Sequence, residues 1–293
     1  MSTPATNTIQ PVPSATRARR APQAGANTGL KASYRQRAKG DRQFVEALAR
    51  GLAILRCFHS GDRYLGNQEI AERTGLPKPT ISRLTHTLTH MGFLSQSARR
   101  DEYALGVGVL ALGHAYLAAL SIREVARPLM QEFADSEKVT VALGEADGPR
   151  MVILDIYHGS PTYRLRLDIG ERVPHKSTAL GHAYLAGLPE ERRAVCIQRL
   201  CDRTPAESRA EFLADVKRSL RDYEKHGFVV SCGDWRPDIF TAGVPLVSAD
   251  GRVFSLSCIG PSFEMTRKRL VAEIAPRLVE LRNRIYEAAN GLF

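Results

Sequence analysis

The chain lacks several features that mark common classes of protein. Its 293 residues include five cysteines, and no two of them form a CxxC pair. They are Cys57, Cys196, Cys201, Cys232 and Cys258. An odd and scattered set of this kind predicts reduced thiols in a cytoplasmic protein, and it argues against a disulfide framework or a zinc ribbon.

Long apolar runs are also missing. The most apolar stretch, residues 107–120, is interrupted by Gly113 and His114 and is shorter than the ~20 residues that a membrane-spanning helix needs. Residues 1–40 lack the apolar centre of a signal peptide. We therefore expect no membrane partner.

Catalytic signatures are absent as well: the sequence has no Gly-rich phosphate loop, nucleophile elbow or pair of catalytic carboxylates. His158, His175 and His182 lie near loops, where a single histidine is more often simply hydrogen-bonded. His86 and His90 have metal-ligand spacing, but no Glu lies between them and the zinc-protease pattern is missing. We predict no enzyme activity, no cofactor and no metal.

Acidic residues do not occur in the first 40 positions, which hold seven Lys and Arg. The net charge of +10 is therefore concentrated at the N-terminal end. This segment has too few apolar residues to offset the entropy cost of ordering, so a disordered basic tail is expected over residues 1–40. Such a tail either adds affinity for a polyanion such as DNA or is a solvated extension without a role.

Residues 41–105 have the periodicity of a small helical module. Apolar residues at three- and four-residue spacing predict a first helix with one buried stripe. That stripe consists of Phe44, Leu48, Leu52, Leu55 and Phe58. A second helix is predicted over 67–74, a turn at Gly75, a third helix over 77–91 and a hairpin over 93–105. This is the order of a winged helix-turn-helix.

In such a module the third helix enters the major groove, and its outward residues meet the base edges. Ile81, Leu84 and Leu88 are predicted to face the core, so the opposite face of the helix points outward. It comprises Lys78, Pro79, Thr80, Ser82, Arg83, His86 and Thr87. Arg83 can donate two hydrogen bonds to guanine, and Arg99 and Arg100 at the hairpin tip can reach the backbone or the minor groove. An ordinary solvated helix face is the alternative.

The second half of the chain alternates strand and helix signals. Residues 106–120 form an apolar helix that needs a partner surface, and a capping-box pattern at Ser121 and Glu124 opens the next helix. Strands are predicted over 139–144, 150–157, 164–168, 228–231, 240–247 and 253–257, and helices over 178–187, 189–201 and 207–226 and around Pro276. Residues 121–293 are therefore expected to form an α+β domain with a largely antiparallel sheet.

Several segments together resemble the IclR family of transcriptional regulators, over roughly residues 41–290. The segments are NQEIA (67–71), TGLPKPTISRL (74–84), YALG (103–106), GERVP (170–174), STALG (177–181), GVPL (243–246) and LSCIGP (256–261). The resemblance implies a GAF-like effector-binding domain, a linker helix that pairs subunits into dimers, and dimers that can pair again into tetramers. It also implies an operator of double-stranded DNA and a small organic or aromatic acid as effector.

By this resemblance, the effector site begins at the helix that opens with residue 178, where free backbone N–H groups can bind an anion. The implied site residues are Thr178, Ala179, Leu180, Gly181, Ser231, Asp234, Thr241, Ser257 and Ile259. Many family members have an acidic residue in place of Ser231 and a serine in place of Ile259. The pocket is therefore expected to be less polar and to take a larger, partly apolar or aromatic acid rather than a glyoxylate-type ligand.

The sequence thus predicts a DNA-binding regulator of catabolic genes whose operator binding responds to such an acid. The alternative is a small-molecule-binding protein or enzyme built on the same domain with a vestigial DNA module. The polar residues and Arg83 on the third helix favour the regulator.

Overall fold

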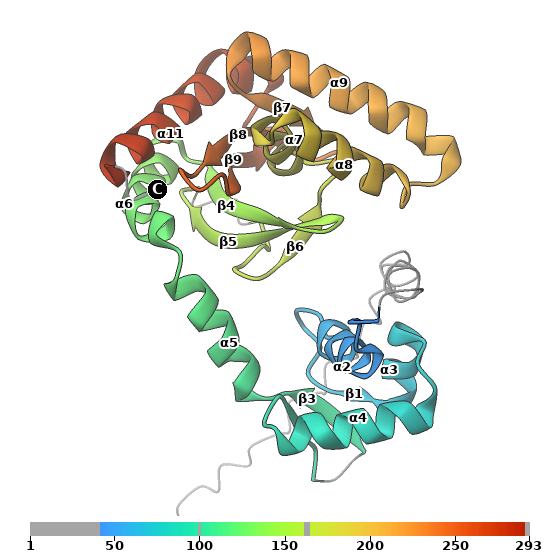
Figure 1. Cartoon of the computed structure of the whole chain (residues 1–293). Helices are drawn as coiled ribbons and strands as arrows, with labels where there is room; N and C mark the ends of the chain where they lie inside the picture. The colour runs from blue at the N-terminus through green and yellow to red at the C-terminus, as the bar shows by residue number, and fades with distance from the viewer. Residues whose placement is uncertain (1–41, 99–100, 161–164, 291–293) are drawn as a thin grey trace, which may run out of the picture.

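The computed structural model describes residues 42–98, 101–160 and 165–290. A small N-terminal module is joined by one helix to a larger domain with a central sheet (Figure 1). The predicted basic tail and the two hairpin arginines, Arg99 and Arg100, lie outside the described residues.

The N-terminal module contains three helices and a three-stranded sheet. The helices are α2 (Glu46–Arg56), α3 (Asn67–Thr74) and α4 (Lys78–His90), and the strands β1 (Leu65–Gly66), β2 (Leu94–Gln96) and β3 (Glu102–Leu105) pair in the order β1-β3-β2. Ile54, Ile70 and Ile81 are fully buried between the helices. Gly75 has a φ of 65° between α3 and α4, a left-handed conformation that glycine adopts without strain. The predicted winged helix-turn-helix is confirmed.

One expectation for this module is wrong. Leu48 and Leu52 were predicted to face the core, but their exposed fractions are 62% and 51%. The helix has two apolar stripes, and Ala53, Ile54 and Cys57 on the other one fill the core. The spacing alone does not tell which stripe is buried.

Helix α5 (Val107–Ala118) crosses from the module to the larger domain (Figure 1), and none of its residues is buried. Helix α6 (Ser121–Glu137) follows after a bend of 82°. Leu120 is the N-cap of α6 and no side chain caps it, so the predicted capping box does not form. Among the described residues no single helix is long and apolar enough to span a membrane; α5 and α6 meet that criterion only as a bent pair.

The larger domain is built on a six-stranded sheet in which every neighbouring pair is antiparallel. Its order is β6-β5-β4-β9-β8-β7, with β4 (Thr140–Asp147), β5 (Arg150–His158), β6 (Arg172–Pro174), β7 (Val229–Cys232), β8 (Ile239–Val247) and β9 (Val253–Pro261). The predicted α+β class with an antiparallel sheet and flanking helices is confirmed.

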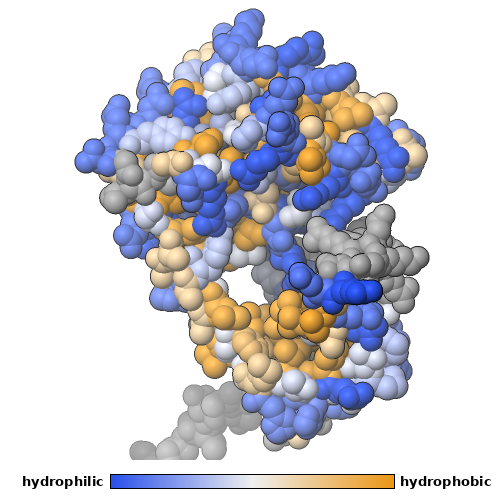
Figure 2. All heavy atoms as spheres, viewed as in Figure 1, coloured by the Kyte–Doolittle hydropathy of each residue, from blue (hydrophilic) through white to orange (hydrophobic). Residues whose placement is uncertain are grey.

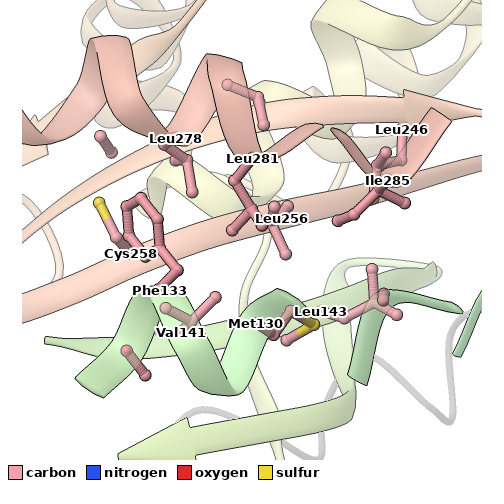
Figure 3. Packing of buried hydrophobic residues seen from close by; sticks show 14 of the residues in the cluster. Met130, Phe133, Val141, Leu143, Leu246, Leu256, Cys258, Leu278, Leu281 and Ile285 are labelled. Atoms are coloured by element: carbon pink, nitrogen blue, oxygen red, sulfur yellow. The ribbon is translucent and has the colours of Figure 1, made fainter. Parts of the chain in front are cut away.

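Helices cover both faces of this sheet. Helix α6 and helix α11 (Ala275–Ala289) pack on one face, where Met130, Phe133, Leu256 and Leu281 interdigitate in the main core (Figure 3). On the other face lies α7 (Ala179–Gly187), backed by α8 (Glu190–Cys201), a 3-10 turn (Ala206–Ser208) and α9 (Arg209–His226) (Figure 1).

Two predicted elements differ in the structure. No strand forms over the described part of 164–168: Leu167 N donates to Leu165 O at 2.8 Å in a local turn, and Leu165 is buried against the α7 side of the sheet. The C-terminal helix contains a turn that was not expected: α10 (Arg267–Arg269) continues without a break through a π turn (Leu270–Ile274) into α11. Pro276 lies directly after this π turn, near the middle of the continuous helix, as predicted.

Candidate DNA interface and ligand site

Helix α4 runs along the side of the N-terminal module that faces away from the larger domain (Figure 1). Six of the seven α4 residues predicted to contact DNA are exposed, and Thr80 is half-buried. The helix contains no Asp or Glu. No carboxylate among the described residues pairs with Lys78 or Arg83, so both cationic groups are available to a polyanion.

Some polar groups of α4 are already engaged within the helix. The Thr87 hydroxyl donates to Arg83 O at 3.0 Å, and the buried Thr85 hydroxyl donates to Ile81 O at 3.0 Å. The Nε2 atoms of His86 and His90 lie 3.1 Å apart. Within the described ranges, no group of three or more His, Cys, Asp and Glu side chains could hold a metal ion. Lys78 and Arg83 are thus the exposed cationic side chains of α4 that have no acidic partner among the described residues.

The start of α7 offers backbone donors to an anion. Thr178 is its N-cap: the hydroxyl accepts from Gly181 N at 3.2 Å and donates to Pro174 O at 2.7 Å. The first N–H groups of any helix have no acceptor within the helix, which leaves those of Ala179 and Leu180 at its positive end. Helix N-termini of this kind can bind anions.

Four of the predicted ligand-site residues share the face of the sheet that α7 covers. Ser231, Thr241 and Ile259 are direct cross-strand partners, and the same row continues to Thr140 on β4. Ser257 lies two residues before Ile259 on the same face. The row lies against α7, because Ile259 and Leu180 belong to one buried cluster and the Ser231 hydroxyl reaches Ser177 O at 3.4 Å.

The hydroxyl groups in this row differ in their hydrogen bonding. Ser257 Oγ donates to Ala242 O at 2.8 Å. Thr241 is only 7% exposed, and its hydroxyl has no hydrogen-bond partner among the described residues. A buried hydroxyl without a partner costs free energy, about 1–3 kcal/mol, that a bound acceptor would recover. Thr241 is therefore the most informative polar group of the site.

The rest of this face is apolar. The buried cluster beside α7 consists of Ala142, Met151, Ile153, Leu165, Val173, Leu180, Ile239 and Ile259. Trp235, on the β7–β8 loop, packs against it, whereas the neighbouring Asp234 is exposed. The site therefore combines one helix N-terminus and one unpaired hydroxyl with an apolar wall.

Close packing holds α7 in place over the sheet. A Cβ atom on Gly243 would lie 2.6 Å from Ala179 O, and a Cβ atom on Gly144 would lie 2.8 Å from Leu180 Cδ2. Glycine at both positions lets the helix approach the strands closely. The first turn of α7 is therefore in direct contact with β4 and β8.

Comparison with known proteins identifies both regions. Residues 47–98 match the IclR helix-turn-helix domain, and residues 114–285 match the bacterial transcriptional regulator IclR C-terminal domain. The chain belongs to the IclR family of transcriptional regulators. The relatives it matches are DNA-binding regulators rather than enzymes.

Individual relatives cover most of the chain. The transcriptional regulator TsaQ1/TsaQ2 of Comamonas testosteroni is 33% identical over 242 residues, 81% of this chain and 86% of that protein. The Pca regulon regulatory protein of Pseudomonas putida is 28% identical, over 82% of each chain. A crystal structure of an IclR-family regulator from Brucella abortus is 44% identical, with a TM-score of 0.76 over 85% of this chain and 94% of that one.

An IclR homolog from Microbacterium hydrocarbonoxydans, complexed with 4-hydroxybenzoate, shares the fold of this IclR-family protein. Its TM-score is 0.67 at 19% identity, over 83% of this chain and 99% of that one. At this level of identity the likeness establishes the fold alone.

Two histidines of this IclR-family protein are buried near the start of α7: His175 precedes the helix and His182 lies within it. His182 Nδ1 lies 2.7 Å from Ser219 Oγ and its Nε2 lies 2.9 Å from Lys176 O, and burial lowers its pKa. Burial also lowers the pKa of His175, to about 4. The sequence indicated neither their burial nor the place of Thr140 in the row, because both depend on contacts between distant segments.

Proposed function

We propose that this IclR-family regulator binds its operator as a homodimer and that a small acid, partly apolar or aromatic, controls the binding from the site between α7 and the sheet. The observation that carries the ligand assignment is the buried, unpaired hydroxyl of Thr241 in a row that reaches the start of α7. A ligand whose acceptor atom receives a hydrogen bond from the Thr241 hydroxyl would recover the free energy that this unpaired group costs the free protein.

The chemistry of the site supports a carboxylate attached to a ring or a branched apolar group. The amides of Ala179 and Leu180 favour the negative end, and Met151, Leu165 and Ile259 favour an apolar remainder. The homolog complexed with 4-hydroxybenzoate and the relative that regulates the Pca regulon support an aromatic acid. We expect the controlled genes to act in the catabolism of such an acid.

The proposed DNA contacts come from α4 and the hairpin. Lys78 and Arg83 are exposed and unpaired with described carboxylates, which supports contacts to phosphate and to a base. Arg99 and Arg100 are proposed to bind the phosphate backbone, so each alanine variant should lower the salt dependence of binding by about one ion. A dimer would place two α4 helices on half-sites about one helical turn or a multiple apart, so the operator should be a rough palindrome.

The proposed dimer surface includes α5. Val107, Leu110 and Leu112 are 80%, 71% and 60% exposed, and hydrophobic atoms gather over the lower part of the linker and the neighbouring side of the N-terminal module (Figure 2). A surface of this kind favours burial against a second copy. Further pairing of dimers through the larger domains would give a tetramer.

Light scattering at micromolar concentration tests the assembly. The parent protein should be at least dimeric, and Leu110→Glu should shift it towards monomer. Leu213→Glu, at an exposed leucine of α9, serves as the matched control and should leave the dimer intact. A monomeric parent that binds one half-site tightly would overturn this part of the proposal.

Calorimetry with 4-hydroxybenzoate, paired with operator binding, tests the ligand site. Ala179→Glu places volume and like charge where the carboxylate binds, so affinity should fall at least tenfold, about 1.4 kcal/mol. Operator affinity without ligand should stay the same, and the response to ligand should disappear with the affinity. Ser257→Leu should act in the same way by filling the site.

Ala206→Glu, the same change at an exposed alanine, is the control. Because Ala179 is fully buried, both pocket variants are first compared with the parent in unfolding experiments. Normal ligand binding and a normal response in Ala179→Glu would place the effector site elsewhere.

A further inference from the structure

Strand β4 is shared by the ligand site and by the contacts that hold the DNA-binding module. Ala142 and Gly144 lie against α7 on the ligand-site face. Glu145 and Asp147, at the end of the same strand, bind the linker helix and the N-terminal module. A shift of this strand therefore affects the site and both contacts together.

Glu145 attaches the linker. Its carboxylate accepts from Nε and Nη2 of Arg252, each at 2.8 Å, and from the hydroxyl of Tyr116 on α5. Arg252 Nη2 also donates to the Tyr116 hydroxyl at 2.6 Å, and its guanidinium lies 5.5 Å from the centre of that ring. Three residues thus hold the C-terminal half of α5 against β4 and the turn before β9.

Asp147 attaches the DNA-binding module itself. Its Oδ2 accepts from Arg172 Nη2 at 2.7 Å and from Arg56 Nη2. Arg56 is the last residue of α2, so this carboxylate joins the winged module to the larger domain of the same chain. Asp147 and Arg56 are about 40% exposed, so the contact is an exposed ion pair that can break without cost to either core.

The turn that follows Asp147 also supports the start of α7. His175 N donates to Pro149 O at 3.2 Å, and His175 Nδ1 lies 3.5 Å from Gly148 O. A Cβ atom on Gly181 would lie 1.9 Å from His175 O, so the first turn of α7 packs directly on this segment. Close-packed interiors transmit displacement rather than absorb it. Movement of the first turn of α7 must displace β4, the turn after it, or both.

We propose that β4 and the turn after it carry the regulatory signal, and that a ligand at the start of α7 releases Arg56 from Asp147 and frees the DNA-binding module to change its position. The ligand part rests on the function proposed above, whereas the Asp147–Arg56 contact does not depend on it. This contact gives the module two states, bound to the larger domain and released, which a ligand can populate differently.

Hydrogen exchange without ligand tests the contact. Asp147→Asn keeps the shape of the side chain and removes its charge, so amides over residues 52–64 should exchange about three- to fivefold faster, the size of effect that an exposed ion pair gives. Arg56→Gln should do the same, and the double variant should add little. Asp202→Asn is the matched control, because the exposed Asp202 carboxylate binds only Gln198 of its own helix among the described residues.

Exchange over 52–64 that is the same in Asp147→Asn and Asp202→Asn would overturn the contact. The second arm adds 4-hydroxybenzoate to the parent protein and should accelerate the same amides, while Asp147→Asn, already released, should show no further change. Bound ligand without any change in exchange would overturn the coupling through β4. Failure of 4-hydroxybenzoate to bind would count against the proposed ligand class alone, because the ligand-free comparison still decides the contact.

Discussion

The winged module and the larger domain present their proposed binding groups in opposite ways. Arg83 and Lys78 stand exposed on one helix face, whereas Thr241 and the first amides of α7 are buried under a packed helix. A DNA-binding surface needs charges that stay in water until a large polyanion arrives. A site for a small acid needs groups that are already desolvated, because only then does each hydrogen bond discriminate between ligands.

The two regions also treat apolar side chains differently. In the larger domain Leu281 is 1% exposed within the core between α11 and the sheet, whereas Leu110 on α5 is 71% exposed (Figure 3). Apolar residues therefore stabilise the larger domain from within. On the linker and on α2 they form an exposed surface, which the proposed dimer would bury.

The largest expected effect sharpens this contrast. Leu281→Ala should lower the free energy of unfolding of the larger domain by about 2–5 kcal/mol, because it leaves a cavity in a close-packed core. Leu110→Ala should lower it by less than about 0.5 kcal/mol under the same conditions. Urea unfolding followed by fluorescence of Trp235 measures this, since the only tryptophan of the chain lies in that domain. Equal losses in the two variants would contradict the contrast.

Acid should affect the larger domain through its buried histidines. The pKa of His175 is lowered from 6.5 to about 4 by burial, and that of His182 is lowered for the same reason. In the unfolded chain each of these histidines binds a proton near pH 6.5, whereas in the folded chain it does not. Stability should therefore be fully present above pH 6.5 and should fall below it, by about 1.4 kcal/mol per pH unit for each histidine until the folded pKa is reached.

Unfolding of the parent and of His175→Gln between pH 5 and 7 measures this dependence. The free energy of unfolding should change less steeply with pH in the variant, by the equivalent of about one bound proton. His226→Gln, at an exposed histidine of the same domain, should keep the slope of the parent. A slope that His175→Gln leaves intact would assign the pH dependence to other groups.

The DNA-binding face gives a third effect. Arg83→Ala should weaken binding to the specific operator by about 1–3 kcal/mol and relax the preference at one base pair. Arg218→Ala removes an exposed positive charge from α9 in the other domain and should leave the preference unchanged. Titration of operator variants, each changed at one base pair, provides the measurement. If Arg83→Ala discriminates among them as the parent does, another residue reads that base.

These contrasts also explain which features the sequence could predict. The exposed face of α4 follows from local periodicity: with Ile81 buried, Arg83 must face outward. On α2 the same reasoning failed, because a helix with two apolar stripes does not reveal which one contacts the core, and Leu48 and Leu52 proved exposed. The choice was made by contacts of Ile54 and Cys57 with other segments.

The ligand site shows the same limit over a longer range. Alternation along a strand predicts that Ser257 and Ile259 share a face. It does not predict that Thr140 stands directly opposite Ile259, because that register joins residues more than a hundred positions apart. The assignment of Ser231 and Thr241 came from family resemblance, and the structure adds their alignment in one row and the unpaired hydroxyl.

The smallest expected effect isolates that hydroxyl. Thr241→Val keeps the size and branching of the side chain and removes a buried group that has no partner among the described residues. The free protein should therefore be as stable as the parent or more stable, by up to about 1 kcal/mol. Affinity for 4-hydroxybenzoate should fall about two- to tenfold, or about 0.4–1.4 kcal/mol. Ser257→Ala should instead lower the stability, because the Ser257 hydroxyl already donates to Ala242 O.

Unfolding and calorimetry on the two variants distinguish a hydroxyl that serves ligand binding from one that stabilises the fold. Lower stability of Thr241→Val with unchanged affinity would mean that this hydroxyl serves the fold and that the ligand binds without it.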